Sequence, residues 1–166
     1  MATMDNLQAA FAGESQANRK YLAFAKKAEA EGKPGIARLF RAAAEAETVH
    51  AHAHLRVMDG VGDTKANIQE AINGEGHEFK EMYPEFIAEA KKEGDQKALR
   101  SFEYAMKVEE IHHDLYSKAA QALESGEDFK AERIYVCTVC GNTELGQAPE
   151  ECPICGVPAS KFTLIQ

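Results

Sequence analysis

Two Cys-x-x-Cys pairs, each followed by glycine, hold all four cysteines of the chain: Cys137-Thr-Val-Cys140-Gly and Cys152-Pro-Ile-Cys155-Gly. The glycine allows each turn a positive φ, so that backbone amides can point at sulfur. Four thiolates in this pattern favour tetrahedral coordination of iron or zinc, and the pattern does not decide between these metals. Disulfides are the alternative, but paired knuckles in a chain expected to be cytosolic make them the weaker interpretation.

Two Glu-x-x-His motifs and three further glutamates fall on the apolar faces of predicted helices. These residues are Glu14, Glu47, His50, Glu75, Glu78, Glu109 and His112. Positions three apart share one face of a helix, so each motif points a carboxylate and an imidazole the same way. Five buried carboxylates need compensating cations, and no lysine or arginine lies on these faces. Two divalent ions supply about +4, and oxygen-rich ligands with one nitrogen per ion favour iron or manganese over zinc, as in di-metal carboxylate bundles.

The spacing of these residues also indicates an internal duplication. The interval from Glu14 to Glu47 is nearly the same as the interval from Glu78 to Glu109. In both cases the second glutamate opens a Glu-x-x-His motif. We therefore expect one helix pair to repeat the other.

The other polar residues near these motifs have weaker claims to a function. Tyr21 and Tyr83 lie at helical steps from Glu14 and Glu78, and either pack in the core or orient a carboxylate through the hydroxyl group. His54 lies one turn beyond His50 and is expected to be a core histidine or to support a ligand. The remaining histidines are expected sideways on the helix or on the surface: His77, His52 and His113.

Four helices must position these groups. Apolar periodicity predicts them over residues 7–28, 36–58, 68–93 and 99–123, with glycines at or shortly after each end. Abundant alanine, glutamate and lysine favour helix throughout. Pro84 is expected to bend the third helix because it lacks a backbone donor. The fold class predicted is mainly α, a four-helix bundle followed by a small metal-binding domain of short strands.

The composition changes sharply near residue 130. All four cysteines and three of the five prolines lie beyond it. Short apolar runs at 134–136 and 162–165 are the predicted strands that hold the knuckles together. The sequence therefore predicts two domains, 1–130 and 131–166.

Length and charge exclude several classes of protein. The chain has 166 residues, a formal net charge of -8 and 45% apolar residues, enough to form a core. The acidic balance argues against nucleic acid or an anionic membrane as the main partner. No apolar run approaches the roughly 20 residues of a membrane span, and the first residues lack the features of a signal peptide, so a cytoplasmic location is expected.

On these residues, the chain resembles the rubrerythrins over essentially its whole length. The most specific stretches are Phe11-Ala-Gly-Glu-Ser-Gln-Ala17, Gly74-Glu-Gly-His-Glu78, Glu81-Met-Tyr-Pro84 and the two knuckles. The resemblance implies a ferritin-like di-iron bundle, with the seven Glu and His residues as ligands, and a rubredoxin-like domain with iron on four cysteines. It also implies that Glu78 and His50 exchange on one iron as the redox state changes. The short loop between Cys140 and Cys152 departs from that of free-standing rubredoxins.

The resemblance further implies a peroxidase that reduces hydrogen peroxide to water. An external reductase or a rubredoxin would supply electrons, which pass one at a time through the cysteine-bound iron to the di-iron site. Two other functions use the same residues. One is iron oxidation or storage of the ferritin kind, and the other is a non-enzymatic bundle whose knuckles hold structural zinc.

The link between the second and third helices suggests a swapped homodimer. About six residues, Gly60 to Lys65, separate these helices, unless residues 66–73 are partly unwound, and six residues reach roughly 20 Å when extended. A bundle helix of 20 residues spans about 30 Å. The link is thus too short to cross the bundle, and we expect the first two helices to pair with the last two of a partner chain.

Overall fold

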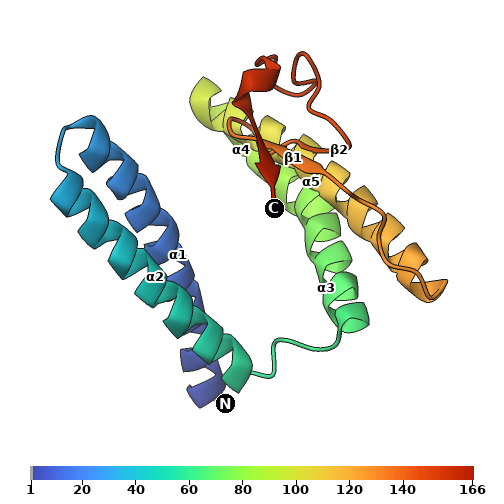
Figure 1. The fold of residues 1–166 in the computed structure, drawn as a ribbon, viewed down its shortest axis with the longest axis horizontal. Helices are drawn as coiled ribbons and strands as arrows, with labels where there is room; N and C mark the ends of the chain where they lie inside the picture. The colour runs from blue at the N-terminus through green and yellow to red at the C-terminus, as the bar shows by residue number, and fades with distance from the viewer. Residues whose placement is uncertain (1) are drawn as a thin grey trace. The chain divides into compact units, whose positions relative to one another are not determined.

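The computed structural model describes residues 2–166 and divides the chain into two compact units. The first unit ends at Gly62, and the second runs from Asp63 to Gln166. The first unit contains two antiparallel helices, and the second contains three α-helices and a small sheet (Figure 1). The fold class predicted from the sequence is confirmed, since helices dominate and short strands lie only at the C-terminal end.

The first unit is a helical hairpin of α1 (Ala2–Ala30) and α2 (Pro34–Val57). Small residues form its seam, because Ala25, Ala28, Ala37, Ala44 and Ala51 are all buried. Alanine lets the two helix axes approach closely while keeping a high helix propensity. Pro34 starts α2 at a position where a missing N–H costs no helical hydrogen bond.

The second unit contains α3 (Thr64–His77), a π-helical segment (Glu78–Met82), α4 (Tyr83–Glu93) and α5 (Gln96–Glu124). Aspartates cap two of these helices: Asp63 accepts a hydrogen bond from the N–H of Ala66, and Asp95 accepts from those of Lys97 and Ala98. Gly94, with φ +73°, ends α4 in the left-handed conformation that glycine adopts most readily.

The predicted third helix is thus interrupted in a way that the sequence does not indicate. A π turn lies just before Pro84, the residue at which a bend was expected, and the N–H of Tyr83 bonds there to the carbonyl of Glu78. Pro84 then occupies the first turn of α4, where its missing N–H is tolerated. The helical path continues to Glu93 in spite of the proline.

The C-terminal residues form a three-stranded antiparallel sheet in the order β2-β1-β3. Its strands are β1 (Ile134–Cys137), β2 (Thr143–Leu145) and β3 (Phe162–Ile165), with a short 3-10 helix (Ala159–Lys161) before β3. The first and last strands confirm the two predicted apolar runs, whereas β2 was not predicted. Strand β2 contacts α5 within the same unit.

The two helical hairpins are copies of each other that differ by one inserted residue. After the π segment, Tyr21, Phe24 and Phe40 align with Tyr83, Phe86 and Phe102 at a single constant offset. Each of these aromatic trios packs together, with ring centroids 5.5 to 6.3 Å apart. Before the π segment the offset is smaller by one, which aligns Glu14 with Glu75. The extra residue is absorbed in the π turn.

In residues 2–166 there is no helix of the length and apolar character needed to cross a bilayer.

Candidate metal centres

The first hairpin brings Glu14, Glu47 and His50 together. Their candidate ligand atoms all lie within 4.8 Å of one another. Nδ1 of His50 is 3.1 Å from Oε2 of Glu47 and 3.8 Å from Oε1 of Glu14. A hydrogen bond with Glu47 raises the pKa of Glu14 above its usual value, which is the behaviour of two carboxylates held side by side without a cation.

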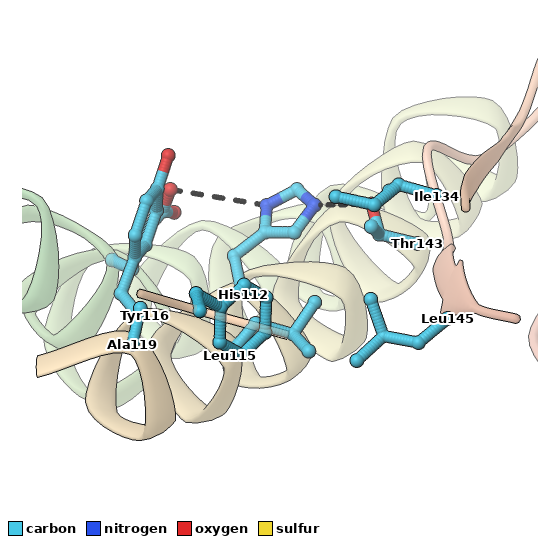
Figure 2. A pocket seen from close by; sticks show the side chains of 9 residues that line it. His112, Leu115, Tyr116, Ala119, Ile134, Thr143 and Leu145 are labelled. Atoms are coloured by element: carbon cyan, nitrogen blue, oxygen red, sulfur yellow. Dashed lines mark hydrogen bonds and ion pairs between the residues drawn. The ribbon is translucent and has the colours of Figure 1, made fainter. Parts of the chain in front are cut away.

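The second hairpin repeats this arrangement with Glu75, Glu109 and His112. Nδ1 of His112 is 2.8 Å from Oε2 of Glu109 and 3.8 Å from Oε1 of Glu75. The side chains of this group are 17 to 28% exposed, whereas the side chain of His50 is 56% exposed. A pocket of 360 Å³ lies beside His112 and Glu75, with apolar walls that include Leu115 and Ile134 (Figure 2).

Glu78 lies close to the second group but outside its cluster of ligand atoms. Burial raises the pKa of Glu78, and the negative charge of Glu109 adds to this effect. The duplication predicted from the sequence pairs Glu14 with Glu78, but the structure shows that Glu75 occupies the equivalent place. The error follows from the inserted residue, which changes the spacing of the second pair. Glu78 aligns with Ala17 and has no counterpart carboxylate in the first hairpin.

The two tyrosines pack in the aromatic trios, as one of their two interpretations predicted. Tyr83 also lies close enough to the carboxylates to be affected by their charge. Burial raises the pKa of its phenol, and the charges of Glu78, Glu109 and Glu75 raise this pKa further. His54 is half-buried, and its charge lowers the pKa of Glu14, so it lies near the first group. His52 and His77 are exposed, and His77 hydrogen-bonds Glu81.

His113 is not a surface residue, contrary to the prediction. Its ring packs edge-on against Phe79, and its Nδ1 is buried without a hydrogen-bond partner among residues 2–166. Gly76 makes room for it, since a Cβ there would lie only 3.3 Å from Cδ2 of His113. The glycine in Gly74-Glu-Gly was the available signal, because a small residue facing a helix partner permits a large one opposite.

The knuckles bring the four cysteines together as free thiols. The sulfurs of Cys137 and Cys155 are 3.7 Å apart, and those of Cys140 and Cys152 are 3.6 Å apart. A tetrahedron with metal–sulfur bonds of about 2.3 Å has edges of about 3.8 Å, so these distances fit one ion. Gly141 and Gly156 have φ of +88° and +74°, which confirms the predicted turns.

Backbone amides also reach the sulfurs, as the turns predicted. Burial alone would raise the pKa of Cys137, but hydrogen bonds from the N–H groups of Cys140 and Val139 lower it to about 7. A thiolate at neutral pH is the form that binds a metal. Burial raises the pKa of Cys140 instead, and its contacts with the other three sulfurs raise it further.

Both kinds of cluster therefore fit metal ions by the chemistry of their donors. The Glu and His groups offer oxygen with one nitrogen each, which suits iron or manganese, and the knuckles offer four sulfurs, which suit iron or zinc. The raised pKa values of Glu14, Glu75 and Glu78 show how strongly clustered carboxylates need a cation.

A pH dependence of stability should follow for the metal-free protein. Burial, then the charge of Glu109, raises the pKa of Glu75 from 4.5 to about 7. Between these values the folded chain binds more protons than the unfolded chain, so stability falls as pH rises. The raised pKa of His112, caused first by its hydrogen bond to Glu109, acts in the same direction. We expect the free energy of unfolding to fall by about 2–3 kcal/mol between about pH 5 and pH 8.

Denaturant unfolding of the metal-free protein across this pH range measures the effect. Glu75→Gln should flatten the dependence and stabilise the metal-free protein at pH 8. Glu81→Gln, at an exposed position of the same helical path, serves as the control. A stability that rises from pH 5 to pH 8 would contradict the prediction.

Comparisons with known proteins agree with this geometry. The model of the rubrerythrin family matches residues 5–120, and the model of the rubrerythrin rubredoxin-like domain matches residues 135–163. The chain is 38% identical to rubrerythrin-2 of Clostridium acetobutylicum, over 96% of this chain and 95% of that protein. It is 36% identical to nigerythrin of Nitratidesulfovibrio vulgaris, over 98% of this chain and 86% of that protein. The solved structure of partially reduced nigerythrin is also similar, with a TM-score of 0.58 and 34% sequence identity. The match covers 98% of this chain and 86% of the nigerythrin chain.

Proposed function

The chain belongs to the rubrerythrin family, and from this premise we propose that it is a non-haem di-iron peroxidase that reduces hydrogen peroxide to water. The family has a di-iron carboxylate site and an iron site with four cysteine ligands. The observation that carries the proposal is the presence of two matched Glu, Glu and His groups and a four-cysteine group in one chain. We propose that the seven Glu and His residues are the ligands of the di-iron site.

The reaction consumes one hydrogen peroxide, two electrons and two protons and yields two waters. Bound as a ferrous pair, iron supplies the two electrons that cleavage of the O–O bond requires. The residues of the chain hold the charge and the protons. Glu75, Glu109 and His112 form a half-buried group, and Tyr83, whose phenol has a raised pKa, stays protonated at neutral pH and can donate a hydrogen bond there.

The cysteine site explains why this domain shares a chain with the bundle. A four-thiolate iron carries one electron at a time, and its potential depends on hydrogen bonds to sulfur such as those of Cys140 and Val139 to Cys137. We propose that an external reductase or rubredoxin delivers electrons to Cys137, Cys140, Cys152 and Cys155. Two successive transfers would restore the reduced state of the di-iron site.

Anaerobic mixing tests the activity directly. The reduced, iron-loaded full-length chain is mixed with one equivalent of hydrogen peroxide and followed by visible absorption. We expect rapid and complete oxidation of the di-iron site without release of dioxygen. Slow or incomplete oxidation would reject the peroxidase assignment. Persistence of a shell of many subunits on gel filtration would instead favour iron storage, and a colourless four-cysteine site in natively purified protein would favour structural zinc.

We propose that the active form is a homodimer with swapped helix pairs. Residues 58–63 link α2 to α3, and α3 is helical from Thr64, so the link gains no length by unwinding. Large apolar side chains on α2 are also uncovered in the single chain: Leu39 is 69% exposed, Val49 58% and Val57 65%. A second chain would bury such a surface.

Mixing two defective chains tests the swap. Glu47→Ala damages the first hairpin and Glu109→Ala the second. In a swapped heterodimer one site combines both damaged hairpins, and the other combines both intact hairpins. Unfolding and refolding the two variants together should therefore restore half of the di-iron sites in each heterodimer. An unswapped dimer would leave every site damaged, so absence of recovery would reject the swap.

A further inference from the structure

A hydrogen bond links the second metal-binding group to the knuckle domain. Nε2 of His112, on α5, lies 2.9 Å from the hydroxyl oxygen of Thr143, on β2. Figure 2 shows the imidazole between two partners, with Thr143 on the side of the strand and an ion-pair contact on the other ring nitrogen. The knuckle backbone is close to the same helix, since a Cβ on Gly141 would lie 3.6 Å from Val108.

The Thr143 hydroxyl has a second partner within the knuckle. Thr143 donates its hydroxyl hydrogen to the carbonyl oxygen of Gly141, at 3.1 Å. A hydroxyl group has one hydrogen to donate and two lone pairs that accept. With this hydrogen directed at Gly141, the oxygen of Thr143 keeps a lone pair that accepts from Nε2 of His112 when Nε2 carries a hydrogen.

We propose that Thr143 is a positioning residue that selects the ring nitrogen of His112 used for metal binding. With the hydrogen on Nε2, the lone pair of the neutral ring is on Nδ1, the nitrogen that faces Glu109 and Glu75. Hydrogen bonds of this kind fix the tautomer and orientation of metal-binding histidines. The inference rests on the proposed function only in taking these three residues as ligands.

The corresponding imidazole of the first hairpin is more exposed. Nδ1 of His50 faces Glu47 and Glu14 as Nδ1 of His112 faces Glu109 and Glu75, but the side chain of His50 is 56% exposed and that of His112 is 28% exposed. The hydrogen bond to Thr143 thus holds the less exposed of the two imidazoles.

The same contact joins the two metal centres by a short route. Cys140 precedes Gly141, whose carbonyl accepts from Thr143, whose oxygen accepts from His112. Under the proposed function, one electron at a time passes from the cysteine site to the di-iron site. The route offers covalent and hydrogen-bonded links from a sulfur ligand to an imidazole ligand.

Cobalt binding tests the positioning role without any turnover. The metal-free full-length chain is titrated with Co²⁺, whose thiolate and carboxylate–imidazole complexes absorb at different wavelengths. Thr143→Val should weaken the carboxylate–imidazole complex ~10–100-fold, in the range found for lost supporting hydrogen bonds. Thr143→Ser, which keeps the hydroxyl, should bind as the parent does. Thr163→Val is the matched control, because Thr163 and Thr143 both pair with Val136 in the sheet.

Nitrogen NMR of the histidine-labelled chain loaded with Zn²⁺ gives a second measurement. His112 should bind the metal through Nδ1 and carry its hydrogen on Nε2 in the parent, and should lose this single arrangement in Thr143→Val, while the signals of His50 stay unchanged. Parent-like cobalt binding by Thr143→Val, weak binding by Thr143→Ser, or a hydrogen on Nδ1 in the parent would overturn the inference. Failure of the parent to form the carboxylate–imidazole complex would overturn the proposed function itself.

Discussion

Replacing Glu109 with alanine should remove the di-iron site and spare the cysteine site, so that iron falls from about three ions per chain to about one. Glu109 is 17% exposed and lies 2.8 Å from the imidazole of His112. Its charge also raises the pKa of both Glu75 and Glu78, which shows that it faces both of them. Without it, the second group keeps too few anionic ligands to hold iron, and oxidation of the reduced chain by peroxide should fall to background.

Metal analysis with Mössbauer spectroscopy measures this result, since coupled and thiolate-bound irons give different signals. Glu110→Ala is the matched control, because Glu110 is the next residue on α5 and is exposed. It should keep all three ions. Retention of a coupled iron pair in Glu109→Ala would show that Glu109 is not a ligand.

Replacing Cys152 with serine should leave the first turnover of the reduced chain intact and slow all later turnovers. Cys152 is 2% exposed, and its sulfur lies 3.6 Å from that of Cys140, so its loss breaks the tetrahedron. A chemically reduced chain should still consume one equivalent of peroxide at the parent rate. Steady-state turnover with a protein electron donor should drop by two orders of magnitude or more, taking ~10²-fold as the scale of lost metal function.

Stopped-flow mixing and steady-state assays on the same preparation give the two rates. Thr138→Ser changes a neighbouring exposed knuckle residue and should leave both rates unchanged. Equal loss of the single-turnover reaction in Cys152→Ser would mean that the cysteine site supports the structure of the di-iron site. Undiminished steady-state turnover would mean that electrons enter by another route.

Local patterns predicted most of the fold. Helical periodicity and end signals found the hairpins, because glycines such as Gly32 and Gly94 and the cap residue Asp95 act within a few residues of the sequence. The cysteine knuckles could be predicted equally well, since their spacing and glycines define the turn that presents sulfur. The Glu-x-x-His motifs needed only the helical repeat to show that each motif shares one face.

Features that depend on tertiary contacts could not be predicted from the sequence. His113 was misplaced because its burial depends on Gly76 of another helix, which no periodicity on α5 reveals. The role inferred for Thr143 depends on a strand and a helix that lie far apart in the sequence and meet in the fold. Glu78 was paired with the wrong residue because an insertion shifts the helical frame, and one sequence does not show where such a shift is absorbed.

The π turn marks the place where the two hairpins differ in length. The offset between them is larger by one after the turn than before it, so either the second hairpin gained a residue there or the first hairpin lost one. Glu78, the one carboxylate without a twin, opens this turn. Deleting an exposed residue of the π turn, such as Lys80, would give the two hairpins one constant offset along their whole length. Glu75 and Tyr83 would then remain equivalent to Glu14 and Tyr21. The backbone should change only around Glu78. A one-codon deletion thus tests the role proposed for Glu78 while Glu75 and Tyr83 keep their places.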